Sequence, residues 1–395
     1  MMEQHFAPEQ RRRLTLKTGK ERVLRNRHPW IFAGAIHDER GPEDAAIADL
    51  FDGEGKRLAS GFYSRHSQIR LRALTFAEEE LTPDLLRQRI RAAIARRKRF
   101  FGEGTNAARL IHAEGDDLSS IVVDRYNDLL VVEIANRGVE LLKPLIVETL
   151  REELAPRGIY FKNDLPVRGL ERLPTEGEWL GEGEPVADVH EHGLRFRVEP
   201  AEGQKTGFFL DQRENRQITR ELARGRRVLN LFSYSGAFGV YAAAGGATSV
   251  ENVDVSAAAI ELARQNHALN GTEATFTVAD VFQYVRRRDG RECDLLICDP
   301  PAFAKSRGDV DRAARGYKDV NLFALGKVAP GGLMMTFSCS GHISLDLFQK
   351  IIFAAALDAG RHVSFVRRLT SAEDHPVSLF CPEGEYLKGF LLEVR

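Results

Sequence analysis

The sequence lacks the features of membrane, secreted and metal-stabilised proteins. It has no run of about eighteen uncharged apolar residues, so we expect no membrane span. Its start shows no short apolar core behind basic residues, as a secretory signal would. Only four cysteines occur, all late in the chain and none in a CxxC pair, which excludes a disulfide scaffold and argues against a structural zinc site. We therefore expect a cytoplasmic protein without a metal.

Positive and negative residues nearly cancel over the whole sequence, but they are distributed unevenly along it. The net charge of the 395 residues is −1, yet residues 1–101 carry 21 Lys and Arg against 14 Asp and Glu. The N-terminal part is thus +7 and the remainder −8. This asymmetry favours a basic module that meets an anionic partner, joined to a catalytic body. A basic face that simply meets solvent is the alternative.

The pattern of elements divides the chain into three regions. Residues 1–80 read as short alternating strands, for example Arg13–Leu16 and Ile69–Arg72, with a hairpin signal at 52–55. Residues 81–185 read as a small α+β domain that opens with a helix over 83–101, capped by Thr82. In residues 186–395, strands alternate with amphipathic helices, which predicts an α/β domain with a doubly wound, mostly parallel sheet.

Small residues and aspartates follow the first three predicted strands of this α/β domain. The strand 228–232 runs into the turn Ser233, Tyr234, Ser235 and Gly236, which places backbone N–H groups at a ligand. Asp254 and Asp280 end the next two strands, where they can bind a ribose diol and an adenine amino group. Each aspartate could instead cap its following helix. Because the turn is not GxGxxG, a dinucleotide-dependent dehydrogenase is the weaker interpretation.

The fourth and fifth strands end in candidate catalytic residues. Asp299 is followed by two prolines, which fix a rigid turn and present the carboxylate to a planar substrate. Cys339 lies just past the fifth strand, on the same side, and a thiolate there could add to C6 of a pyrimidine and make C5 nucleophilic. A cysteine is more often a small apolar filler, and the other three are expected to be so.

At these residues the sequence resembles the ribosomal RNA cytosine-5 methyltransferases that carry an N-terminal PUA domain. The resemblance covers nearly the whole chain. The matching stretches are His28–Gly34, Val123–Tyr126, Gln204–Arg213, Asp299–Pro301, Arg315–Asp319 and Phe337–Gly341. It implies an RNA-binding PUA domain at 1–80, a central domain at 81–185 and a class I methyltransferase domain at 186–395 that uses S-adenosylmethionine.

The resemblance also implies roles for individual residues. Cys339 would be the nucleophile and Asp299 would hydrogen-bond the base and border the cofactor. Ala302 stands where other cytosine-5 RNA enzymes place a second cysteine, which leaves open the group that takes the C5 proton. The expected cofactor-binding residues are Lys205, Thr206, Gly207, Phe209, Asp211, Phe232, Ser233, Tyr234, Ser235, Gly236, Asp254, Asp280 and Asp299.

The expected partner is large-subunit ribosomal RNA, through a basic surface around Trp30. Lys17, Arg22, Arg25 and Arg27 suit phosphate contacts and Trp30 suits stacking, although Trp30 could equally be a core aromatic. Two alternatives stay open: methylation of a guanine nitrogen, which needs no thiol, and a non-catalytic RNA-binding assembly factor. The sequence also leaves room for a homodimer, paired through a sheet edge or the PUA domain.

Overall fold

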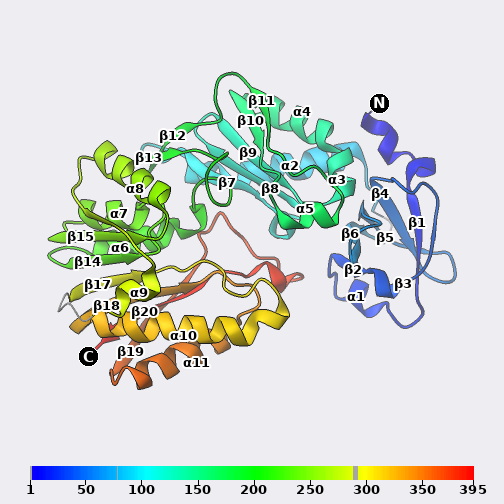
Figure 1. Ribbon diagram of the computed structural model, residues 1–395. Helices are drawn as coiled ribbons and strands as arrows, with labels where there is room; N and C mark the ends of the chain where they lie inside the picture. The colour runs from blue at the N-terminus through cyan, green and yellow to red at the C-terminus, as the bar shows by residue number, and fades with distance from the viewer. Residues whose placement is uncertain (1, 78, 288–291) are drawn as a thin grey trace. The chain divides into compact units, whose positions relative to one another are not determined.

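The computed structural model describes residues 2–77, 79–287 and 292–395, in two compact units (Figure 1). The first unit contains Met1–Asp188, Val198–Phe208 and Asp374–Gly384. The second contains Val189–Arg197, Phe209–Glu373 and Glu385–Arg395. The regions 1–80 and 81–185 therefore lie in the first unit, together with two short segments from the later sequence.

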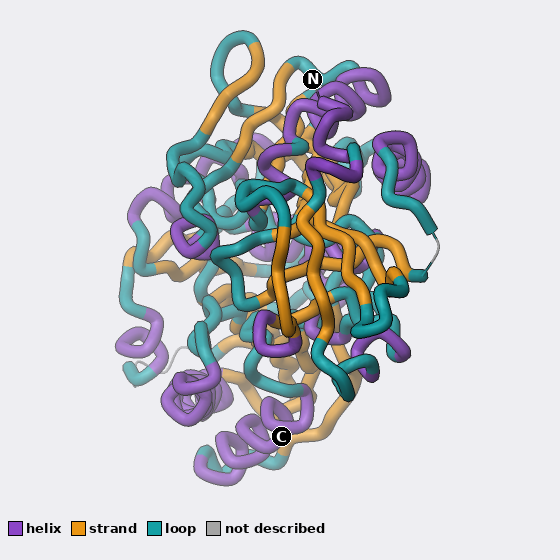
Figure 2. The backbone as a smooth tube through the Cα atoms, turned by 90° about the vertical axis from the view of Figure 1, so that its right-hand side faces the viewer, coloured by secondary structure: helices purple, strands orange, loops and turns teal. Residues whose placement is uncertain are grey.

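The N-terminal region forms a six-stranded sheet in the order β2-β6-β5-β4-β1-β3, and Figure 2 shows its strands in orange. The predicted turn at 52–55 joins β4 to β5, and Asp52 Oδ1 accepts the N–H groups of Glu54 and Lys56 at 3.0 and 2.8 Å. The elements are β1 Arg12–Leu16, α1 Arg22–Arg25, β2 Trp30–Phe32, β3 Ile36–Arg40, β4 Ile47–Phe51, β5 Arg57–Tyr63 and β6 Ile69–Phe76.

The central region forms a five-stranded sheet in the order β11-β10-β9-β8-β7. Its first helix begins as predicted, because the Thr82 side chain accepts the Leu85 N–H at 3.1 Å and Pro83 follows. The elements are α2 Pro83–Arg97, β7 Ala107–His112, β8 Ile121–Tyr126, β9 Leu129–Ile134, α3 Arg137–Leu141, α4 Lys143–Leu154, β10 Gly158–Phe161, α5 Pro166–Leu170 and β11 Glu178–Gly181.

The second unit contains the predicted α/β sheet, with seven strands in the order β16-β15-β14-β17-β18-β20-β19. The first five strands are parallel, and β20 runs antiparallel to both neighbours. The strands are β14 Arg227–Leu231, β15 Ser249–Asp254, β16 Thr275–Val278, β17 Cys293–Cys298, β18 Val328–Ser338, β19 Val363–Thr370 and β20 Lys388–Val394. A hairpin, β12 Ala187–Glu191 and β13 Leu194–Val198, precedes this sheet.

Helices cover both faces of this sheet, because its central strands are apolar on both sides. Leu229 and Leu231 of β14 belong to the core under α9 (Val281–Val285), α10 (Val310–Lys327) and α11 (Leu345–Asp358), whereas Val228 belongs to the core under α6 (Arg213–Leu222) and α7 (Ala237–Ala244). The helices are α6 Arg213–Leu222, α7 Ala237–Ala244, α8 Ala257–Leu269, α9 Val281–Val285, α10 Val310–Lys327 and α11 Leu345–Asp358. The mixed α/β fold class is confirmed.

Several element boundaries differ from the prediction. Strand β7 was missed, and the predicted strand 118–124 begins at Ile121. Helix α10 starts at Val310 rather than 317, after a capping box formed by Ser306 and Asp309. Helix α6 and strand β20 were also missed, since α6 is dominated by charged residues and β20 follows a long irregular segment.

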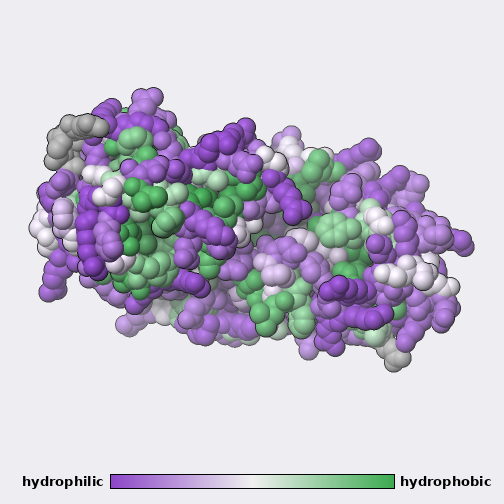
Figure 3. Space-filling model, turned by 90° about the horizontal axis from the view of Figure 1, so that it is seen from below, coloured by the Kyte–Doolittle hydropathy of each residue, from purple (hydrophilic) through white to green (hydrophobic). Residues whose placement is uncertain are grey.

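The second unit carries an apolar patch on its surface (Figure 3). Phe353 and Leu357 of α11 are exposed, as is Phe365 of β19, and they line a cavity of about 330 Å³. Figure 3 shows apolar side chains (green) gathered on the side of the second unit that faces the viewer. Among the described helices, none combines the length and apolar character needed to cross a bilayer.

Candidate active site

The turn after β14 is strained, as functional turns often are. Phe232 and Tyr234 are non-glycine residues with φ of 56° and 44°, and Gly236 follows with φ of 69°. A Cβ atom on Gly236 would lie 2.7 Å from Ala263 Cβ, so only glycine fits where α7 begins. The backbone N–H of Gly236 closes the turn on the Ser233 carbonyl at 2.8 Å.

Asp254 and Asp280 have different surroundings. Asp254 is half-buried, and its two carboxylate oxygens accept the backbone N–H groups of Tyr234 and Ser256, each at 2.9 Å. It therefore fixes the strained turn. Asp280 is exposed and caps α9 by accepting the Gln283 N–H at 2.9 Å, as the alternative interpretation of this residue had it.

Asp299 and Cys339 follow neighbouring parallel strands. Cys298 of β17 pairs with Thr336 of β18, so the two following loops leave the same edge of the sheet. The Cys339 thiol is half-buried and lies 3.7 Å from the carbonyl oxygen of Pro300. Cys298 is buried, and burial raises its pKa well above the range of a reactive thiol.

Tyr317 of α10 joins these two loops. Its hydroxyl lies 2.9 Å from Ser340 Oγ, which also accepts the Ala304 N–H at 3.2 Å. Burial raises the pKa of Tyr317, so its hydroxyl is neutral. The ring centroids of Phe303 and Tyr317 are 4.6 Å apart. Phe303 also packs against Phe282, which in turn packs against Phe232. Tyr317 was not predicted as a site residue, although it lies within the Arg315–Asp319 stretch.

The second half of the Gln204–Arg213 stretch contacts the candidate site directly. Phe209 packs edge-to-face on Tyr234, with ring centroids 5.3 Å apart. Gln212 Nε2 donates to Asp299 Oδ2 at 2.9 Å, and Tyr386 donates to Asp211 Oδ2 at 2.6 Å. Gln212 and Tyr386 were not predicted as site residues, because neither residue type has a chemical signal of its own.

The first half of that stretch belongs to the first unit. Thr206 is buried and donates to Asp124 Oδ2 at 2.5 Å, and its Oγ1 lies 2.8 Å from the Tyr126 hydroxyl. Asp124 in turn binds Arg109 through two hydrogen bonds of 2.7 Å. Lys205 has φ of 48° and Gly207 φ of 121°. The Val123–Tyr126 stretch therefore anchors this half of the loop.

The residues at the strand ends suit a bound adenosine-type cofactor. Ser233 is buried, and its Oγ makes no hydrogen bond within the described chain. A buried hydroxyl of this kind calls for a ligand or water. It lies beside Asp254 and Phe232, in a turn whose strain is held by neighbouring contacts.

Comparison with known proteins decides the family. Residues 162–379 match the S-adenosylmethionine-dependent methyltransferase model. The chain belongs to this methyltransferase family. Residues 14–76 match the PUA-like domain, which confirms that part of the prediction. Chemically, the cofactor of this family supplies the methyl group.

Two relatives and one solved structure match nearly the whole chain. Ribosomal RNA large subunit methyltransferase I of Shewanella denitrificans is 43% identical, covering 97% of this chain and 99% of the relative. That of Serratia proteamaculans is 42% identical over the same shares. A methyltransferase crystal structure complexed with SAH superposes with a TM-score of 0.84 at 23% identity, covering 96% of this chain and 99% of that one, and shows the fold.

The predicted RNA-binding residues of the methyltransferase cluster around α1. Arg22, Arg25 and Arg27 are exposed, and Lys17 is exposed while it donates to the Gly34 carbonyl at 2.9 Å. Trp30 is only half-buried, but its indole N–H donates to Glu114 Oε1 at 2.8 Å. Trp30 therefore ties the PUA-like domain to the central domain.

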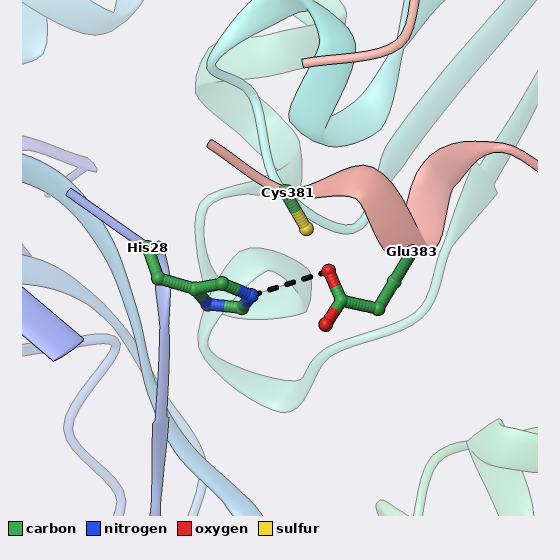
Figure 4. A group of neighbouring side chains, drawn as sticks. All are labelled: His28, Cys381 and Glu383. Atoms are coloured by element: carbon green, nitrogen blue, oxygen red, sulfur yellow. Dashed lines mark hydrogen bonds and ion pairs between the residues drawn. The ribbon is translucent and has the colours of Figure 1, made fainter. Parts of the chain in front are cut away.

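Among the described residues, one group could in principle hold a metal: His28, Cys381 and Glu383. Figure 4 shows His28 pointing at Glu383 with Cys381 beside them, and His28 Nε2 lies 3.2 Å from Glu383 Oε2. Nδ1 of His28 accepts the Trp30 N–H at 3.1 Å, so the proton of the neutral ring is on Nε2. Burial raises the pKa of Cys381 to about 12. Both His28 and the Cys381 thiol interact with the Glu383 carboxylate.

Proposed function

We propose that this methyltransferase modifies C5 of a cytosine in large-subunit ribosomal RNA, with Cys339 as the nucleophile. The relatives of 41–43% identity carry the name ribosomal RNA large subunit methyltransferase I, and they match 97% of the chain. The observation that carries the chemistry is Cys339 itself. It is a half-buried thiol at the end of β18, 3.7 Å from the rigid Asp299–Pro301 turn.

Each residue of the site has a defined task in this proposal. Asp299, oriented by Gln212, accepts a hydrogen bond from the exocyclic amino group of the base, beside N3. The Cys339 thiolate adds to C6, and the electron pair of the C5–C6 double bond makes C5 nucleophilic. C5 would take the methyl group from S-adenosylmethionine, whose methyl–sulfur bond breaks so that S-adenosylhomocysteine leaves. Loss of the C5 proton then restores the double bond and expels the thiolate. Ala302 has no group for that proton transfer, so the proton leaves to another acceptor.

Cofactor binding is proposed at the ends of β14 and β15. Asp254 accepts hydrogen bonds from the ribose hydroxyl groups. Ser233 and the N–H groups of the 232–236 turn contact the polar end of the cofactor. Phe209, beside Tyr234, forms an apolar wall. Asp280 follows β16. Its carboxylate would accept a hydrogen bond from the adenine amino group while it continues to cap α9.

RNA binding is proposed for the exposed cations around α1. Lys17, Arg22, Arg25 and Arg27 would contact phosphates, which gives a sequence-independent, salt-sensitive affinity. Trp30 is held by Glu114, so we expect it to shape this surface more than to stack on a base.

The decisive experiment is nucleoside mass spectrometry of unmodified large-subunit RNA after incubation with labelled S-adenosylmethionine. We expect the label in 5-methylcytidine, and loss of that label in Cys339→Ala. Cys293→Ala is the matched control, because Cys293 is buried at the start of β17, remote in register from the loop, and should leave activity intact. Label in a guanosine, or full activity of Cys339→Ala, would contradict the thiolate mechanism. An absence of cofactor binding would favour an assembly factor.

A further inference from the structure

Lys388 is a buried cation beside the nucleophile loop. It is the first residue of β20 and pairs in register with Ser338, the last residue of β18. Its side chain is buried, with 5% of the residue exposed. Its ammonium group donates to the carbonyl oxygens of Ser340 and Ile343, at 2.8 and 2.6 Å. These two bonds hold the turn that begins at Cys339.

The charge of Lys388 is not neutralised by a carboxylate. Buried lysines are rare unless they are paired, yet Lys388 forms no ion pair among the residues described here. Its electrostatic partners are Cys339 and, from an exposed position, Glu385. Burial lowers the pKa of Lys388, since the charged form loses hydration. An anion at Cys339 would supply the missing counter-charge.

Other elements also present titratable or polar groups to Cys339. From α10 comes the Tyr317 hydroxyl, which is neutral because burial raises its pKa. After β17 come Asp299, which is acidic, and the Pro300 carbonyl that contacts the thiol. Both would disfavour a thiolate. Lys388 of β20 brings a positive charge that can offset them.

We propose that Lys388 is a positioning residue that activates Cys339: its ammonium group fixes the Ser340–Ile343 turn and stabilises the thiolate across it. This inference rests on the proposed role of Cys339 as nucleophile. It assigns a task to β20, a strand whose first residue would otherwise bury a charge without a function. A nearby opposite charge shifts an ionisation equilibrium by about one unit or more.

The test is the pH dependence of Cys339 alkylation by iodoacetamide in the full chain, followed by peptide mass spectrometry. Because Cys293, Cys298 and Cys381 are buried, the half-buried Cys339 should react first. In the wild type we expect the midpoint of reactivity below the ordinary thiol value of about 8.5. In Lys388→Met it should rise by about one unit, and in Lys388→Arg it should stay near the wild-type value.

Lys327→Met is the matched control. Lys327 is also buried and donates to a backbone carbonyl, that of Arg287, at 2.5 Å, but it lies at the other end of the sheet. It should leave the midpoint unchanged. A wild-type midpoint at or above about 8.5 would overturn the proposal even if Lys388→Met does not fold. An unshifted midpoint in folded Lys388→Met would also overturn it.

This readout is independent of the proposed function. Cys339→Ala activity on RNA tests the nucleophile, whereas alkylation needs neither RNA nor cofactor. An active Cys339→Ala with a shifted alkylation midpoint in Lys388→Met would refute the cytosine mechanism and leave the lysine–thiol coupling established. An inactive Cys339→Ala with no shift would refute the coupling alone.

Discussion

Removing Arg216 from the buried pair that it forms with Glu191 should destabilise the second unit strongly. The guanidinium of Arg216 binds the carboxylate through two hydrogen bonds of 2.7 and 2.8 Å, and the side chains are 1% and 0% exposed. Arg216 also donates to the Phe209 carbonyl at 2.8 Å, which places it behind the proposed cofactor wall. The pair therefore links β12 and α6 to the candidate site.

The magnitude follows from what Arg216→Met leaves behind. Breaking a buried ion pair typically costs about 3–5 kcal/mol, because the remaining charge is buried without compensation. Arg213 lies 3.5 Å from the same carboxylate, and the Tyr241 hydroxyl donates to it at 2.9 Å, so part of the charge stays compensated. We therefore expect Arg216→Met to lower the free energy of unfolding by about 3 kcal/mol, the lower end of this range. For a unit of this size that lowers Tm by about 6–12 °C.

The pH dependence has a definite sign. Burial raises the pKa of Glu191, but the Arg216 guanidinium outweighs it and holds the pKa below the ordinary value. In the wild type the pair therefore stabilises the fold at pH values above the pKa of Glu191 in the unfolded chain, about 4.5. This stabilisation is lost as the pH falls through the lower pKa of Glu191 in the folded protein. In Arg216→Met burial dominates and raises that pKa. The stability difference from the wild type should therefore shrink when pH is lowered from 7 to 5.

Thermal and urea unfolding measure this difference. Lys350→Met is the control, because the Lys350–Asp346 pair is 70% and 75% exposed and such pairs contribute less than about 1 kcal/mol. A loss below about 1 kcal/mol for Arg216→Met, or a difference independent of pH, would refute the reasoning.

Three further changes test other parts of the second unit. Gly239→Ala would place a Cβ 2.4 Å from Asn252 Oδ1 and should lower the free energy of unfolding by about 1–3 kcal/mol, measured by thermal unfolding. The control is Gly326→Ala, whose Cβ would meet no atom within 4 Å beyond its chain neighbours and its own helix backbone and should not destabilise the protein. Equal losses in the two variants would contradict the packing argument. Asp254→Asn removes a charged acceptor of two backbone N–H groups and should weaken S-adenosylmethionine binding about tenfold by calorimetry; unchanged affinity would exclude it from the site. Burial lowers the pKa of His267 to about 4, so the unfolded chain takes up the proton first and stability should fall by up to about 3 kcal/mol from pH 6.5 to 4; a His267→Gln variant with the same pH slope would refute this.

Much of the α/β unit could be predicted because its signals are local. Strand β14 is an apolar run that ends in small residues, and the pairing of β17 with β18 follows from their order in a parallel sheet. Asp299 and Cys339 could be proposed from sequence because each type of side chain has distinct chemistry at a strand end. The sequence could not show that Asp280 caps a helix, since capping and ligand binding need the same carboxylate.

The contacts that were missed arise from distant parts of the chain. Gln212 contacts Asp299 across 87 positions, and Lys388 reaches Ser340 across 48. Neither contact has a periodicity or motif, because tertiary packing alone sets it. For the same reason, Trp30 could not be assigned from sequence: its burial depends on Glu114 of the central domain.

The segment 374–384 sets a limit on the order in which the protein can mature during synthesis. Asp374 is fully buried in the first unit, where Oδ2 accepts the Arg109 backbone N–H at 2.9 Å and its carbonyl accepts Arg97 at 3.2 Å. A growing chain that has reached residue 188 therefore contains the PUA-like and central domains, but it lacks Asp374, the acceptor for Arg97 and for the Arg109 N–H. The first unit can therefore complete its buried hydrogen bonds only after Asp374 has been synthesised.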